Sequence, residues 1–159
     1  MPSPRWSLAG VYPGDFVATR SYESIVKAND RDMLALAKTA TFVPVGKENE
    51  KSRRANERVN ASYSAPTKGF GYSLGKTTIR SPRDGTFYAA AAFEYWGDVY
   101  VNGERVIRDA KKRPAEPQFV HFKPVAFPIR LKKGDNELLL VNHGGSGAHY
   151  FVFYVNFDE

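Results

Sequence analysis

The spacing of the turn signals from Tyr72 onward limits the possible folds of this chain more than any other feature. Pro82-Arg-Asp-Gly85, Asn102-Gly103 and Lys133-Gly-Asp-Asn136 separate short apolar and aromatic runs. Asn-Gly is a strong hairpin signal because a type I′ turn needs positive φ at both central residues. Roughly nine or ten short strands separated by such turns predict an all-β chain folded as a sandwich or jelly roll.

Composition agrees with one β-rich domain over residues 1–159. The chain contains 11 Phe, 9 Tyr and 2 Trp, and aromatic residues favour half-buried pleated sheets. No apolar run approaches the ~20 residues of a membrane helix. The first ten residues, MPSPRWSLAG, lack the apolar segment of a secretory signal. The chain has no cysteine, which excludes disulfides, thiolate metal sites and cysteine nucleophiles.

Residues 24–57 differ from the rest of the chain and are predicted to be an insertion containing one helix and a loop. Asp30 can cap a short helix near residues 30–38, whose apolar side includes Met33 and Leu36. The charged stretch 47–60 has little to bury, and it predicts a surface loop.

Two later stretches predict particular kinds of strand. The run TFYAAAAFEYW, residues 86–96, suits a strand that is covered on both faces. In the stretch 125–131 apolar residues alternate and define a buried face, while Pro128 cannot donate a ladder hydrogen bond. We therefore expect that strand to lie at a sheet edge or to carry a bulge. Residues 143–149, HGGSGAH, predict a loop before the closing strand YFVFYVNF.

The order of these stretches resembles a known family. WSLAGVYPGDF, SPRDGTFYAAAAFEYWGDVYVNGERVI and FPIRLKKGDNELLLVNHGGSGAHYFVFYV follow one another between Trp6 and Val155. This pattern is similar to the galactose-binding-domain-like β-sandwiches attached to bacterial polysaccharide-degrading enzymes. The resemblance implies a jelly-roll fold, an extracellular or periplasmic location, and a carbohydrate-binding accessory role beside a catalytic domain.

Carbohydrate binding needs an aromatic plane for the C–H faces of a sugar and polar groups for its hydroxyls. Tyr95 and Trp96 are predicted to end a strand, and Tyr150 follows the 143–149 loop. In a jelly roll the strand ends gather at two poles, so these residues can meet. The candidate ligand-binding residues are Tyr95, Trp96, Asp98, Arg105, Asn142, His143, His149 and Tyr150.

No catalytic residues are predicted, and the chain is not expected to be an enzyme. Ser146 stands near two histidines, but Ala148 replaces the last glycine of a G-x-S-x-G elbow. Gly75-Lys76-Thr77 lacks the first glycine of a phosphate loop, because position 70 is Phe. No cofactor is expected. A structural Ca²⁺ held by Asp84, Glu94 or Asp98 is weighed against solvated turn acids, which the absence of a calcium-loop spacing favours.

Three functions therefore remain open. The first is non-catalytic recognition of a polysaccharide, acidic in view of the net charge of +6. The second is a structural accessory domain that packs against a catalytic partner. The third is binding of anions or nucleic acid through the basic loops, although no nucleic-acid motif is present.

Overall fold

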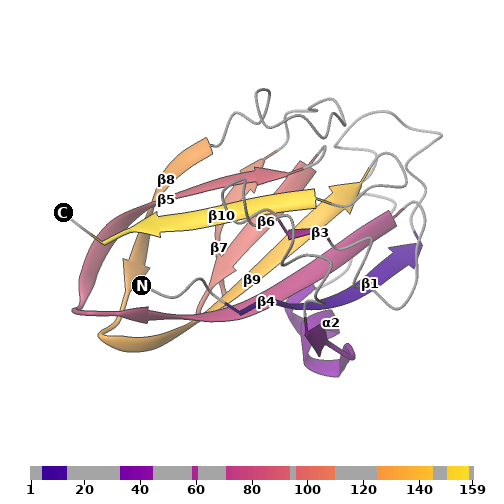
Figure 1. Ribbon diagram of the computed structural model, residues 1–159, viewed down its shortest axis with the longest axis horizontal. Helices are drawn as coiled ribbons and strands as arrows, with labels where there is room; N and C mark the ends of the chain where they lie inside the picture. Colours follow the sequence, from indigo (N-terminus) through magenta and orange to yellow (C-terminus); the bar gives the residue numbers. More distant parts are fainter. Residues whose placement is uncertain are drawn as a thin grey trace.

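The computed structural model describes residues 5–13, 33–44, 59–60, 71–93, 96–109, 125–144 and 150–157. These residues form two antiparallel sheets and one short helix, stacked as two layers (Figure 1). The predicted jelly-roll β-sandwich with a short helix is confirmed. None of the helices in the described ranges is long and apolar enough to cross a membrane.

The larger sheet has six strands and the smaller has four. The long pair β4–β9 forms the centre of the larger sheet, with an unbroken register from Gly71↔Gly144 to Ser81↔Gly134. In spatial order the larger sheet comprises β2 (Val43–Pro44), β1 (Ser7–Pro13), β4 (Gly71–Ser81), β9 (Gly134–Gly144), β6 (Trp96–Val101) and β7 (Glu104–Asp109); the smaller comprises β3 (Val59–Asn60), β10 (Tyr150–Asn156), β5 (Gly85–Phe93) and β8 (Val125–Leu131).

Strand β9 contributes side chains to two separate cores. Leu138 and Leu140 belong to the core between the sheets, whereas Leu139 and Val141 belong to a second cluster on the outer face of the six-stranded sheet. This division follows from the two-residue period of a strand. Gly97, on neighbouring β6, allows a close approach in the inter-sheet core, because a Cβ there would overlap the ring of Phe93.

Helix α2 (Met33–Thr39) covers the second cluster. Met33 is buried against Tyr72, Leu74 and Trp96, and Phe42 packs at the margin of the same cluster. The helix was predicted near residues 30–38, and within the described residues it spans Met33–Thr39; Asp30 lies outside the described residues. The outer face of the six-stranded sheet is therefore partly a second core.

Two asparagines join the turns at one end of the sandwich. Asn102 and Gly103 have φ of 49° and 83°, as the predicted hairpin requires. Asn102 Nδ2 donates to Asn136 Oδ1 at 2.9 Å, and the Glu137 amide donates to Asn102 Oδ1 at 2.9 Å. Asn136, which is 1% exposed, also bonds the backbone of the β8–β9 turn. These bonds fix the β6–β7 hairpin to the start of β9.

The position of Pro128 is as predicted. Strand β8 is the last strand of the four-stranded sheet, with Pro128 opposite Tyr88 of β5. An edge strand tolerates the missing N–H of proline, because one side of the strand has no neighbour to receive a bond.

Three details of the strand prediction were wrong. Val59–Asn60, expected within a surface loop, pairs with β10 as strand β3. Trp96 does not end the 86–96 run but begins β6, which lies in the other sheet. His143 was expected in a loop but belongs to β9, because the pairing of β9 with β4 extends to Gly144.

Candidate functional site

The structure brings four of the eight candidate residues to one sheet face. Trp96 and Asp98 on β6, Arg105 on β7 and His143 on β9 all lie on the outer face of the six-stranded sheet. Alternation along β9 directs the side chain of Asn142 to the opposite, inner face. Tyr95 and His149 lie outside the described residues, and Tyr150 is described only as the first residue of β10.

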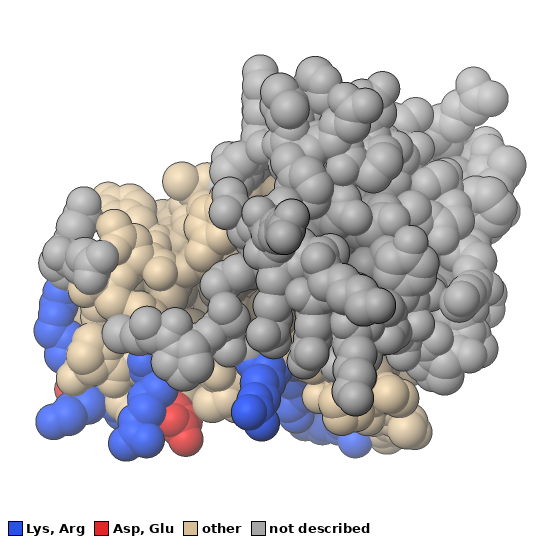
Figure 2. Space-filling view, in the orientation of Figure 1, with Lys and Arg blue, Asp and Glu red and all other residues tan. Residues whose placement is uncertain are grey.

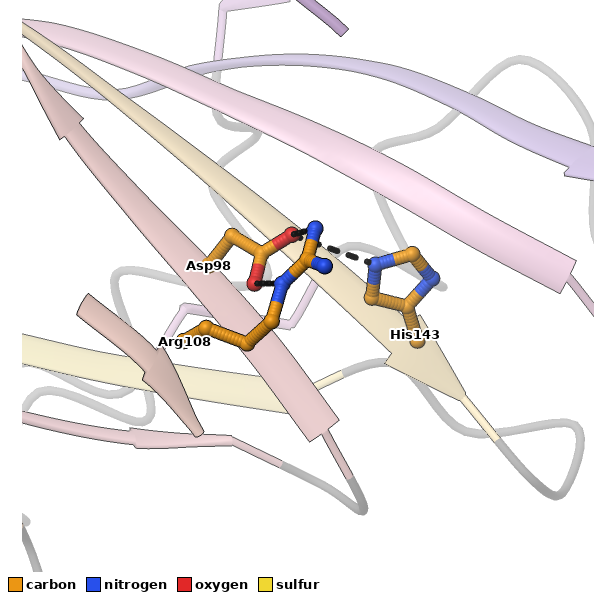
Figure 3. A network of polar contacts seen from close by, with 3 residues as sticks. All are labelled: Asp98, Arg108 and His143. Atoms are coloured by element: carbon orange, nitrogen blue, oxygen red, sulfur yellow. Dashed lines mark hydrogen bonds and ion pairs between the residues drawn. The ribbon is translucent and has the colours of Figure 1, made fainter. Parts of the chain in front are cut away.

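Asp98 is the centre of a polar network on this face (Figure 3). Arg108 Nε donates to Asp98 Oδ1 at 2.9 Å, and Arg108 Nη2 donates to Oδ2 at 3.2 Å. His143 Nε2 lies 3.8 Å from Asp98 Oδ2, the oxygen that also accepts from Arg108 Nη2. Asp98 and His143 are almost fully buried, while the Arg108 side chain is 34% exposed. The network therefore connects three neighbouring strands and reaches solvent at Arg108.

The electrostatics of the network favour an ionised Asp98. Burial acts to raise the pKa of this carboxyl, but the contacts from His143 and Arg108 outweigh burial, so the pKa of Asp98 lies below its usual value. Within the described ranges, no group of three or more His, Asp or Glu residues is placed to hold a metal ion. A structural Ca²⁺ held by Asp84, Glu94 or Asp98 stays a prediction.

Trp96 does not have the exposure that sugar stacking requires. Its side chain is 2% exposed and packs in the cluster that α2 covers. The sequence could not indicate this burial, because it depends on a helix some sixty residues away folding over the sheet. An exposed aromatic plane has to come from other residues, and the side chain of Tyr150 is outside the described part.

The outer face of the four-stranded sheet presents such a plane. Tyr88 on β5 is 59% exposed and Tyr154 on β10 is 38% exposed. Tyr88 is paired with Asn156, and Tyr154 with Ala90, so the two tyrosines are diagonal neighbours on one face. Thr86, Ala126, Pro128, Arg130 and Asn156 are exposed around them on the same face. We call this set of residues the tyrosine face.

Sequence analysis missed the tyrosine face because it treated residues 86–96 as covered on both sides. The available signal was the alternation of Thr86 and Tyr88 with the buried Phe87 and Ala89. That alternation is typical of a strand with one solvated face.

Arg108 was also missed. It stands three residues after Arg105, and a regular strand would direct side chains at this spacing to opposite faces. The register of β6 with β7 shifts between Val99 and Tyr100, and this irregularity brings Arg108 to the same face as Arg105.

Asn142 has a different environment from the one predicted. It lies opposite Ser73 in the β4–β9 register, and both side chains are buried on the inner face. Neither Ser73 Oγ nor the amide of Asn142 has a hydrogen-bond partner in the described ranges. Buried polar groups of this kind commonly bond ordered water.

Comparisons with known proteins find distant structural similarities. No protein-family model matches it, and no curated protein matches it. A family 35 carbohydrate binding module from an environmental isolate is 19% identical, with a TM-score of 0.44, over 59% of this chain and 72% of that module. CBM35 from Paenibacillus barcinonensis is also 19% identical, with a TM-score of 0.41, over 62% of this chain and 77% of that one.

A β-glucosidase from Kluyveromyces marxianus matches at 22% identity and a TM-score of 0.44. The match covers 54% of this chain but only 10% of the β-glucosidase, so the chain is similar to a small part of that enzyme. All these TM-scores are below 0.5. The function of this chain therefore has to be argued from its own residues.

Proposed function

We propose that this chain is a non-catalytic carbohydrate-binding domain that recognises a polysaccharide through the tyrosine face. The observation that carries the proposal is the exposure of Tyr88 and Tyr154 on one open sheet face. Large aromatic side chains are normally buried in a core, so two exposed neighbours on a regular sheet indicate a binding surface.

The chemistry of the tyrosine face suits a sugar chain. Tyrosine offers an apolar ring for the C–H face of a sugar and a hydroxyl for hydrogen bonding. Thr86, Arg130 and Asn156 add polar groups around the rings, while Ala90 opposite Tyr154 and Pro128 opposite Tyr88 are short neighbours of the rings. An exposed sheet face with these groups fits an extended polymer better than a small molecule, which needs a concave pocket.

We also propose that the polysaccharide is acidic. The net charge is +6, and Figure 2 displays Lys and Arg side chains along the lower edge of the molecule. Arg83 in the β4–β5 turn and Lys132 and Lys133 in the β8–β9 turn are exposed. A positive field of this kind attracts polyanions and speeds their association.

An extracellular or periplasmic setting beside a catalytic domain completes the proposal. Its support is the resemblance of residues 6–155 to accessory domains of polysaccharide-degrading enzymes.

The test is binding to a panel of soluble polymers: polygalacturonate and hyaluronan as acidic polymers, galactan and arabinoxylan as neutral ones. Affinity gel electrophoresis identifies the polymers that bind, and titration calorimetry gives Kd. We expect Tyr88→Ala to weaken binding about tenfold, close to 1.4 kcal/mol, and the double variant with Tyr154→Ala to weaken it about a hundredfold if the rings act independently.

Tyr88→Phe keeps the ring and should retain most of the affinity. Val43→Ala, which removes an exposed apolar side chain from the other sheet, is the matched control and should bind as the unmodified chain does. Binding that survives the double tyrosine variant would refute the tyrosine face as the site. If the chain binds none of these polymers, the result would favour a domain that only packs against a partner.

A further inference from the structure

Strand β7 contains a bulge that changes which side chains share a face. Arg105 pairs with Tyr100 and Ile107 pairs with Val99, so Val106 is an extra residue without a partner on β6. Val106 and Ile107 are consecutive, yet both pack against the core between the sheets. Arg105 and Arg108, which flank them, are consequently both on the outer face.

The bulge places Arg105 and Arg108 on one face of the end strand of the six-stranded sheet. Their partners on β6, Tyr100 and Asp98, are two residues apart, which is about 7 Å along a strand. Arg105 is exposed and the Arg108 side chain is 34% exposed, so solvent reaches both. Bulges commonly re-aim side chains next to functional sites.

Neighbouring residues hold the two arginines in place. Asp98 holds Arg108 by the two hydrogen bonds given above, which fixes the plane of its guanidinium. Arg105 lies against the hydroxyl of Tyr100, whose pKa is raised, chiefly by burial and further by Asp98, although Arg105 and Arg108 oppose the rise. Tyr100 is half-buried in the outer cluster, so its ring is a fixed surface between the arginines and the sheet.

The charges of this group do not cancel. Arg108 is paired with the one carboxylate of this group, Asp98, whereas Arg105 is exposed beside Tyr100 and keeps its positive charge for a ligand. Arginine binds carboxylate and sulfate groups through paired N–H donors in a fixed geometry. A group held in advance by its neighbours also loses less entropy when a ligand binds.

We propose that Arg105, Arg108 and Tyr100 form an anion-binding site that takes the carboxylate or sulfate group of an acidic sugar. The site lies on the outer face of the six-stranded sheet, opposite the tyrosine face. The domain thus has two separate contact surfaces on opposite faces, so each would contact a different stretch of the polymer. The identity of the ligand as a sugar rests on the proposed function; the anion site itself rests on the geometry of β7.

The first experiment measures the site with small probes on the intact chain. Galacturonic acid, galactose and inorganic sulfate are titrated into the ¹⁵N-labelled protein, and the arginine Nε–Hε signals are followed by NMR. Galacturonic acid should shift two of these signals and galactose should not. Arg105→Ala should abolish the shift, whereas Arg80→Ala, which removes an equal charge from an exposed position on β4, should leave it intact.

The second experiment compares polygalacturonate with its fully methyl-esterified form, which has the same backbone without the charge. Arg105→Ala should weaken binding of polygalacturonate about tenfold and leave the esterified polymer unaffected; Arg105→Lys should recover only part of the loss, because lysine lacks the paired donors. An equal loss for both polymers, or no loss for either, would overturn the anion site.

The remaining outcomes separate the two proposals and the source of the anion. If galacturonic acid shifts the arginine signals but no polymer binds at the tyrosines, the proposed function alone is refuted. Polymer binding that depends on the tyrosines but not on Arg105 would refute the anion site alone. Shifts with sulfate but none with galacturonic acid would exclude a sugar carboxylate as the ligand; the sugar assignment would be overturned if a sulfated galactose caused no shift either. Single-stranded DNA that binds through Arg105 as tightly as polygalacturonate would overturn it as well.

Discussion

Replacing Asp98 with asparagine is expected to lower the free energy of unfolding by about 2–3 kcal/mol. Removing one partner of a buried ion pair costs about 3–5 kcal/mol when the other charge stays buried. The Arg108 side chain is 34% exposed and can turn toward water, which reduces the cost. Urea unfolding followed by tryptophan fluorescence measures the change, because Trp6 and Trp96 are both buried.

Asp135→Asn is the matched control for this variant. It makes the same chemical change at an exposed position of β9, where the expected effect is below about 0.5 kcal/mol. Equal stability of the two variants would show that the network around Asp98 contributes nothing to the fold.

A separate prediction concerns how the free energy of unfolding of the unmodified chain and of Asp98→Asn depends on pH. The pKa of Asp98 is lowered by folding, so its contribution is fully present above the unfolded-state pKa of about 3.9. That contribution is lost as the pH falls through the lower folded-state pKa. The stability difference between the unmodified chain and Asp98→Asn should therefore shrink below about pH 4. A difference that grows as the solution becomes more acidic would contradict the lowered pKa.

Much of the fold could be predicted because turn residues act locally. Asn102-Gly103 needs no distant contact to favour a hairpin, and its φ angles are those the sequence indicated. The same holds for Pro128, whose missing N–H restricts it to an edge wherever the strand lies. The buried run Leu138–Val141 could also be recognised from its composition alone.

The candidate site was harder to predict because it depends on contacts between distant segments. Trp96 is buried only because α2, a part of the predicted insertion, packs over the outer face of the sheet. Arg108 joins Arg105 only because Val106 is bulged out of the ladder, and no residue in Glu104–Asp109 signals that bulge. Asp98, Arg105 and His143 were nominated for their chemistry, and the pairing of β6 with β7 and β9 placed them on one face.

Asn136→Ala is expected to lower the free energy of unfolding by about 3–4 kcal/mol, a larger effect than that of Asp98→Asn. Its side chain bonds the backbone N–H and C=O of Lys132, the C=O of Gly134 and the side chain of Asn102. Each buried polar group left without a partner costs about 1–3 kcal/mol. Water can reach some of these groups at the turn, so the total loss stays below the sum of the full costs of all these groups.

Asn136→Ala should also loosen the β6–β7 hairpin, because Asn102 loses the contact that fixes it to β9. Amide exchange at Glu137, whose N–H donates to Asn102, should therefore quicken more than exchange at Leu140 in the middle of the same strand. Asn102→Gly tolerates the positive φ, removes the shared contact and the acceptor of the Glu137 amide, and leaves the bonds from Asn136 to the β8–β9 turn, so it should cost about half as much. If Asn102→Gly and Asn136→Ala cost the same, the turn bonds of Asn136 would contribute nothing, and the stabilisation would come from the bonds of Asn102 alone.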